Sequence, residues 1–201
     1  MKKLMYITLI AGVAFMVQAC HSPDQKWDSK SSADTLNNMK DSVADPSKSI
    51  TKDLVMKVSK DDAKFAVAAA DGGIAEVELG TLAQQKAASA KVKDFGAMMV
   101  SDHSKANDEM KALAKSKGIT LPTAIDSDEQ KVKDKLSSKS GADFDKAYVD
   151  DMIEDHKNDI KKFEDATQNL KDPDLKAFAV KTLPTLKMHL DAIQKNNENM
   201  K

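Results

Sequence analysis

The sequence has no arginine. All 31 basic side chains are lysines, 32 acidic side chains oppose them, and the formal net charge is −1. Arginine supplies the planar, two-pronged hydrogen-bond donor that suits phosphate groups, and nucleic-acid-binding domains carry clustered positive charge. We therefore expect no nucleic-acid partner, and the lysine-rich segments are predicted to be solvated helix faces.

Cysteine, glycine and aromatic residues are also scarce. The 201 residues include one cysteine, seven glycines and 4% aromatic side chains. One cysteine cannot form an internal disulfide bond, and the sequence has no CxxC motif, no glycine-rich phosphate loop and no pattern of a catalytic triad. We expect a binding or structural protein rather than an enzyme, and the abundant alanine, leucine and lysine favour helices over sheets.

The first twenty residues have the features of a bacterial lipoprotein signal. Lys2 and Lys3 precede an apolar run over 4–17, which is too short for a comfortable membrane span. The run ends in "VQAC", which places Cys20 where such signals carry the lipidated cysteine. We predict a signal peptide over 1–19 and a lipid anchor on Cys20. The alternative is ordinary secretory cleavage that leaves Cys20 as an incidental thiol.

The lipid anchor predicts a membrane-attached protein of the bacterial cell envelope, on the outer membrane and facing the periplasm. Residues 20–60 are rich in Ser, Asp, Lys and Asn and show no hydrophobic periodicity. We interpret them as a flexible tether between the lipid and a domain over 61–198.

Apolar residues recur at helical spacing in four long segments of that domain. The segments are about 61–88, 89–117, 142–170 and 173–198, and a short segment to about 138 precedes the third. Ser59 or Asp61 is predicted to cap the first helix, Gly118 to end the second, and Asp126 or Ser127 to begin the short one. The pattern predicts an all-α fold, an up-down-up-down four-helix bundle with a short extra helix between helices 2 and 3.

One ionisable residue lies on the apolar stripe of each long segment. His156, for example, lies between Met152 and Ile160, at the spacing of one helix face. The four residues are Glu76, His103, His156 and His189. Each is near the middle of its segment, so helices of similar length packed side by side would bring all four to one layer of the core.

A buried layer of one carboxylate and three imidazoles has two interpretations. Three histidines and a glutamate suit a single transition-metal ion such as Zn, Cu, Fe or Ni, and a small ligand is also possible. Alternatively, the four side chains hydrogen-bond to one another as part of a structural or interaction module that binds no ligand. The sequence leaves both hypotheses open.

A two-iron redox enzyme is a weaker third hypothesis. Di-iron sites in helical bundles use Glu-x-x-His pairs. Here the residues three positions before the histidines are Val100, Ile153 and Leu186. The neighbouring Asp102 and Asp155 are expected to point about 100° round their helices, away from the layer.

Four segments resemble a known family. They include "VKDFGAMMVSDHSKANDEMKALAKSKGITLP" and "DPDLKAFAVKTLPTLKMHLDAI", within a similarity that extends from about Asp61 to Ile193. The sequence is similar to an uncharacterised family of bacterial domains, described as ferritin-like and as outer-membrane or periplasmic proteins. The resemblance implies the fold and an envelope location. It implies no reaction.

Overall fold

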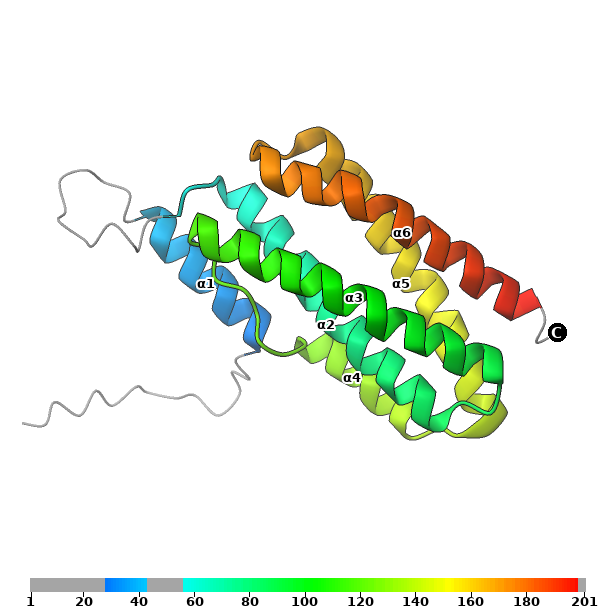
Figure 1. The fold of residues 1–201 in the computed structure, drawn as a ribbon. Helices are drawn as coiled ribbons and strands as arrows, with labels where there is room; N and C mark the ends of the chain where they lie inside the picture. Colours follow the sequence, from blue (N-terminus) through cyan, green and yellow to red (C-terminus); the bar gives the residue numbers. More distant parts are fainter. Residues whose placement is uncertain (1–27, 43–55, 199–201) are drawn as a thin grey trace, which may run out of the picture.

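The computed structural model describes residues 28–42 and 56–198, and within them it contains helices and no strand. The helices are α1 (Ser29–Ser42), α2 (Lys60–Lys86), α3 (Ala90–Lys117), α4 (Ser127–Ser137), α5 (Gly141–Asn169) and α6 (Pro173–Glu198) (Figure 1). The predicted signal peptide and Cys20 lie outside the described residues. Among the helices described, none combines the length and the hydropathy that a membrane crossing requires.

Local capping interactions set the helix ends. The Ser59 hydroxyl accepts a hydrogen bond from the backbone N–H of Asp62 and begins α2. Asp126 caps α4 in the same way, and the Asp172 carboxylate accepts two backbone N–H groups in the first turn of α6. Gly118 ends α3 with a φ of 71°, a conformation that suits glycine. The predicted ends of the four long helices and the short one are confirmed within one or two residues.

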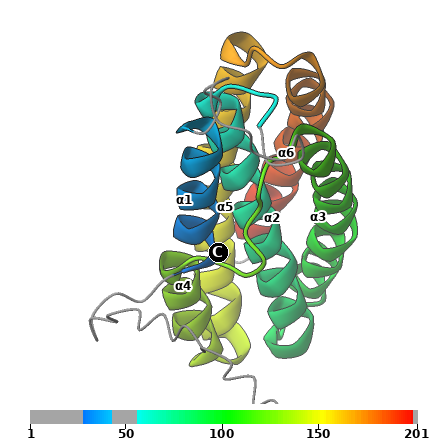
Figure 2. The ribbon, with the colours of Figure 1, turned by 90° about the vertical axis from the view of Figure 1, so that its left-hand side faces the viewer.

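The four long helices lie side by side as two hairpins, α2 with α3 and α5 with α6 (Figures 1 and 2). At one end, the backbone N–H groups of Lys171 and Asp172, just after α5, donate to Asp62 in the first turn of α2. At the other, Asn196 near the end of α6 donates to the Lys91 carbonyl at the start of α3. Consecutive helices within each hairpin are therefore antiparallel, but α3 and α5 run in the same direction.

The order is therefore up-down-down-up, and the predicted up-down-up-down order is wrong for the third and fourth long helices. The reason is the connection over 118–140, which contains α4. This connection returns along the side of the molecule, so that α5 starts beside the end of α2, where Ala87 and Gly141 form an isolated bridge (Figure 1). The sequence predicts the short extra helix. It does not predict that this helix lies in a crossover connection between the end of α3 and the start of α5.

Residues 29–42, which we predicted to be part of a flexible tether, form helix α1. It lies with α4 along one side of the molecule (Figure 2). The Asn37 amide donates to the Thr120 carbonyl at 2.8 Å and accepts the Thr120 N–H at 2.7 Å, while Lys30 Nζ lies 3.0 Å from Asp71 and 3.1 Å from Asp126. Few of its apolar side chains join the core: Ala33 is buried, but Leu36 and Met39 are exposed.

A close approach of backbones holds the first hairpin together. A Cβ atom on Gly80 of α2 would lie 2.6 Å from the carbonyl oxygen of Gly96 on α3. Real Cβ atoms do not approach an oxygen this closely, so both glycines are required by the separation of the helices.

The core consists of two apolar clusters. One contains Met110, Phe163, Phe178 and Leu186, and the other contains Phe95, Met99, Tyr148, Met152 and Ile193. On every long helix, the ionisable residue found in the sequence lies between the residues that join one cluster and those that join the other. The polar layer therefore crosses the middle of the core.

Candidate metal centre

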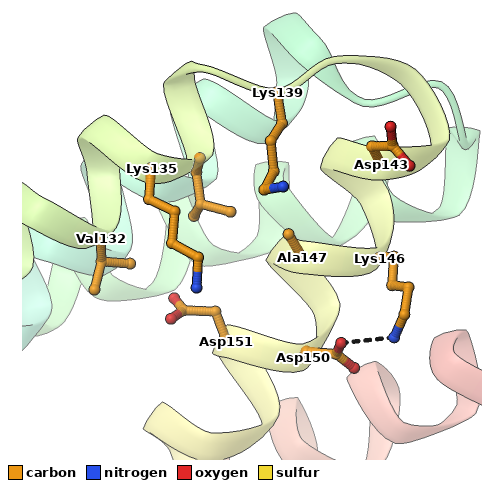
Figure 3. A pocket seen from close by; sticks show the side chains of 9 residues that line it. Val132, Lys135, Lys139, Asp143, Lys146, Ala147, Asp150 and Asp151 are labelled. Carbon is orange, nitrogen blue, oxygen red and sulfur yellow. Dashed lines mark hydrogen bonds and ion pairs between the residues drawn. The ribbon is translucent and has the colours of Figure 1, made fainter.

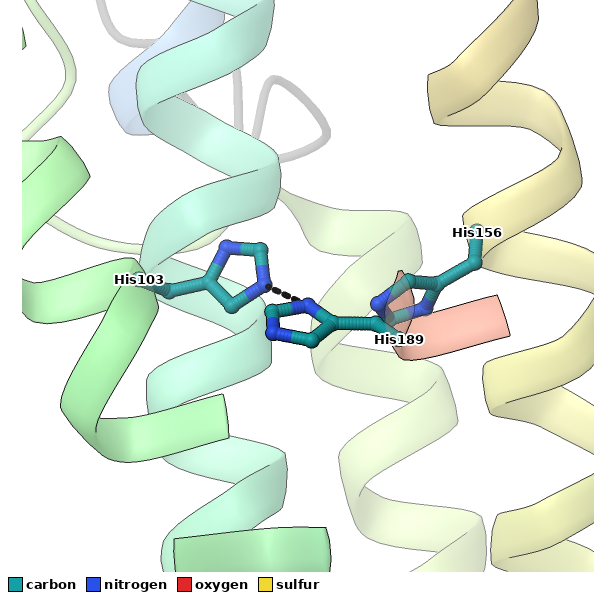
Figure 4. Close-up of side chains that lie close together, drawn as sticks. All are labelled: His103, His156 and His189. Carbon is teal, nitrogen blue, oxygen red and sulfur yellow. Dashed lines mark hydrogen bonds between the residues drawn. The ribbon is translucent and has the colours of Figure 1, made fainter. Parts of the chain in front are cut away.

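The structure brings all four predicted site residues together. Glu76 is 1% exposed, His103 6%, and His156 and His189 0%. The three imidazoles, from α3, α5 and α6, point toward one another (Figure 4). Each helix supplies one residue, because each presents its apolar stripe to the common core.

The layer is a chain of five contacts. His189 Nε2 lies 3.2 Å from Asp102 Oδ2, and His189 Nδ1 lies 3.3 Å from His103 Nε2. His103 Nδ1 lies 2.6 Å from Glu76 Oε2, and Glu76 Oε1 lies 3.4 Å from His156 Nε2. His156 Nδ1 ends the chain, 3.0 Å from the carbonyl oxygen of Met152.

These contacts outnumber the hydrogens available to fill them. Each neutral imidazole carries one N–H, and a protonated Glu76 would add one more, so at most four hydrogens serve five contacts. A carbonyl oxygen can only accept, so the hydrogen of His156 is on Nδ1, and Nε2 presents a lone pair to Glu76. Glu76 Oε1 and His156 Nε2 are both buried side-chain atoms without a hydrogen-bond partner. This leaves a buried oxygen and a buried nitrogen that a cation would satisfy.

Burial also sets the charge of the layer. It raises the pKa of Glu76 to about 8, against the attraction of His156, because a carboxylate loses its hydration there. It lowers the pKa of His103 and of His189 to about 4, and it lowers the pKa of His156. The histidines are therefore neutral at neutral pH, which is the form that binds metal ions.

Two aspartates expected to point away from the layer are part of it. The Asp102 carboxylate reaches His189; burial raises its pKa, but the hydrogen bonds from His189 and Lys105 outweigh burial and lower the pKa below its usual value. Asp155 has a carboxylate oxygen within 4.8 Å of donor atoms of Glu76 and His156. The expectation failed because a residue 100° from the core-facing stripe points toward a flanking helix, not toward solvent. The repeated Asp-His pair in "SDHS" and "EDHK" was the available signal.

Two cavities adjoin the layer. A surface cavity of about 280 Å³ between α3 and α6 is lined by Asp102, His103, His189 and Met188, among others. An internal cavity of about 20 Å³, large enough for one water molecule, is lined by Glu76, His103 and Asn107 among others. The surface cavity thus reaches His103 and His189 from the side of α3 and α6.

A third cavity, of about 490 Å³, lies between α4 and α5 (Figure 3). Its polar lining is lysine and aspartate side chains, including Lys135, Lys139 and Asp151. None of the four layer residues lines it.

A family model described as "Domain of unknown function (DUF4142)" matches residues 50–195, so the chain belongs to this family. No curated protein matches the chain. Among solved structures, the fold is similar to that of CopM. The Cu(I)-bound form is 17% identical with a TM-score of 0.59, and the match covers 69% of this chain and 96% of that one. The Cu(II)-bound form is 15% identical, with a TM-score of 0.60 and coverages of 70% and 97%. At these identities the similarity shows a common helical fold.

Proposed function

We propose that this member of the DUF4142 family is a metal-binding protein that holds one transition-metal ion in its core, in the layer formed by Glu76, His103, His156 and His189. The observation that carries the proposal is the pair Glu76 Oε1 and His156 Nε2. Two buried electron-pair donors face each other at 3.4 Å, and neither has a hydrogen-bond partner. A folded protein rarely leaves such a pair without a cation or an ordered water.

The residue types in the layer suit a metal ion, and two pairs of donor atoms have the spacing of ligands on one ion. Ligands bound at about 2.0–2.1 Å to a tetrahedral ion lie roughly 3.3–3.4 Å from each other. The distances from His103 Nε2 to His189 Nδ1, 3.3 Å, and from Glu76 Oε1 to His156 Nε2, 3.4 Å, agree with that spacing. Asp102 on His189 and the Met152 carbonyl on His156 would fix the orientation of two of the imidazoles.

Imidazole-rich sites favour late first-row ions, of which Cu²⁺ binds most tightly. CopM, which shares this fold, has been solved with Cu(I), Cu(II) and Ag bound. We therefore place copper ahead of zinc as the ion of this site. The sequence lacks the Glu-x-x-His pairs of two-iron sites, so binding, not oxidation, is the proposed activity.

The setting of the domain is part of the same proposal. We assign the four long helices to a ferritin-like bundle, since ferritin-like folds have one long crossover and α4 lies within one here. The predicted signal over 1–19 and lipid on Cys20 would anchor the domain in the bacterial envelope, where it would meet metal ions entering from outside the cell.

A direct test is the metal content of protein made without an affinity tag. Chelator-treated protein is loaded with Cu(I) under reducing conditions, freed of excess metal and analysed by mass spectrometry. We expect one ion per chain in the wild type and a loss of at least tenfold in affinity in His156→Gln. Tyr148→Phe is the control, because it removes a buried hydroxyl without a hydrogen-bond partner from the same helix and should retain the ion.

The competing hypothesis is a structural layer without an ion. It is favoured because a protonated Glu76 and three neutral imidazoles carry four hydrogens, enough to make hydrogen bonds in four of the five contacts of the layer. On that hypothesis the wild type takes up no stoichiometric metal, and His156→Gln changes only the free energy of unfolding.

A further inference from the structure

We infer that the layer offers a cation two overlapping positions that share His156 Nε2, one lined by three imidazoles and one by two carboxylates. A single ion would occupy one or the other according to its preference for nitrogen or oxygen. This inference rests on the proposed metal-binding function and adds Asp155 to it.

Two sets of side chains meet the geometric requirement for an ion. The imidazole position consists of His103, His156 and His189, each with a ring nitrogen within 4.8 Å of the others. The carboxylate position consists of Glu76, Asp155 and His156, whose donor atoms also lie within 4.8 Å of one another. The unpartnered atoms Glu76 Oε1 and His156 Nε2 are both available to the carboxylate position, and His156 Nε2 to either.

The two positions cannot be filled together through His156. Its Nδ1 hydrogen is donated to the Met152 carbonyl, so one ring nitrogen remains, and that lone pair binds one ion. Occupancy of the imidazole position therefore removes a ligand from the carboxylate position, and the reverse is also true.

The side chains around the two positions also differ in type: carboxylates surround the carboxylate position, and a thioether lies near the imidazole position. Asp155 is half-buried and lies in the negative field of Glu76, Asp159 and Glu129, with Lys162 as the nearby cation. On the other side, the lining of the cavity beside His103 and His189 includes the half-exposed thioether of Met188, together with charged side chains such as Lys105 and Lys181. Hard cations such as Mn²⁺ favour carboxylates, while copper and silver ions favour imidazole and thioether groups.

The test measures two ions on the same protein. Mn²⁺ binding is read from the loss of the free-ion signal in electron paramagnetic resonance, and Cu(I) binding from competition with a coloured chelator under reducing conditions. In Asp155→Asn we expect Mn²⁺ affinity to fall at least tenfold, with Cu(I) affinity within about threefold of the wild type. In His189→Gln we expect the reverse. His156→Gln should weaken both, and Cu(I) should displace Mn²⁺ from the wild type.

Retained Cu(I) binding shows that Asp155→Asn is folded, and retained Mn²⁺ binding shows that His189→Gln is folded, because binding requires an intact layer. Asp150→Asn is the matched control: it removes one negative charge from an exposed site on the same helix, where Asp150 pairs with Lys146. It should leave both affinities unchanged.

Several outcomes separate this inference from the proposed function. Cu(I) binding without any Mn²⁺ binding, an equal loss of both ions in Asp155→Asn, or simultaneous binding of both ions would each overturn the two-position inference and leave metal binding standing. Failure of the wild type to bind either ion would overturn both.

Discussion

Glu76 is a carboxylate placed where the surrounding residues are apolar or neutral. It is 1% exposed, and the hydrogen bond of 2.6 Å to His103 serves one of its oxygens while the other has none. A buried carboxylate without full compensation costs several kcal/mol, so Glu76 is expected to lower the stability of the metal-free protein.

We predict that Glu76→Gln makes the metal-free protein more stable, by about 1–2 kcal/mol in the free energy of unfolding. The amide N–H can donate to His156 Nε2, which has no hydrogen-bond partner in the wild type, and the amide leaves no ionisable group buried at this position. The same change should weaken Mn²⁺ binding at least tenfold, because Glu76 is a ligand of the carboxylate position. Urea unfolding of chelator-treated protein measures the first effect. Glu78→Gln, at a half-exposed position on the same helix, is the control. A Glu76→Gln variant less stable than the wild type would show that the carboxylate forms an ion pair instead.

Glu129, in the first turn of α4, makes stability depend on pH. Burial, and the negative charges of Asp126 and Asp71 among others, raise its pKa to about 7, from 4.5. Between these values the folded protein holds a proton that the unfolded chain has lost, so the free energy of unfolding falls as pH rises.

In metal-free protein, Glu129→Gln should match the wild type near pH 4.5 and exceed it by about 1 kcal/mol at pH 7.5, after allowance for partial solvent screening. Urea unfolding at both pH values measures the difference. Glu154→Gln, at an exposed position on α5, should be near neutral at both. If the advantage of Glu129→Gln does not grow with pH, the assignment is contradicted.

The four layer residues were predictable because each interrupts an apolar stripe, a pattern that depends only on helical periodicity. Asp102 and Asp155 were not, because the periodicity says which face a residue occupies and not which helix lies against that face. The apolar stripes also cannot predict which metal ion the layer would bind. That choice depends on distances between side chains of different helices.

At the scale of the helices, the ends of α2 to α6 could be predicted from caps such as Ser59, Gly118 and Asp172, since capping is a local interaction. Helix α1 could not. Its polar contacts join Lys30 to Asp71 and Asp126, and Asn37 to Thr120, all of which are distant in the sequence. A polar stretch that folds against distant backbone groups looks like a linker in sequence.

We predict that Asn37→Ala lowers the free energy of unfolding by about 1–3 kcal/mol, because it leaves the N–H and carbonyl groups of Thr120 without their partner. The loss should be accompanied by faster proteolysis in the segment around Thr120. Met39→Ala, on the same helix at a side chain 59% exposed, is the control and should change stability by no more than about 0.5 kcal/mol. Equal stability of the two variants would mean that α1 does not secure the crossover.

At the scale of the whole molecule, the class of fold was predictable, and the directions of α5 and α6 were not. The length of a connection does not show whether it forms a hairpin or a crossover unless its path is known. The segment 118–140, a loop with a short helix, is compatible with both. The layer formed nevertheless. A residue near the middle of a helix stays near the middle when the helix is reversed, so the prediction of the site did not depend on the predicted topology.

The donors are divided evenly between the hairpins: Glu76 and His103 belong to the first, His156 and His189 to the second. Neither hairpin alone has enough ligands to hold an ion tightly. The crossover therefore acts as a tether that sets the effective concentration of one half-site at the other. If the chain were opened within 119–125, the two fragments would lose that advantage, and their association would come to depend on the supply of metal.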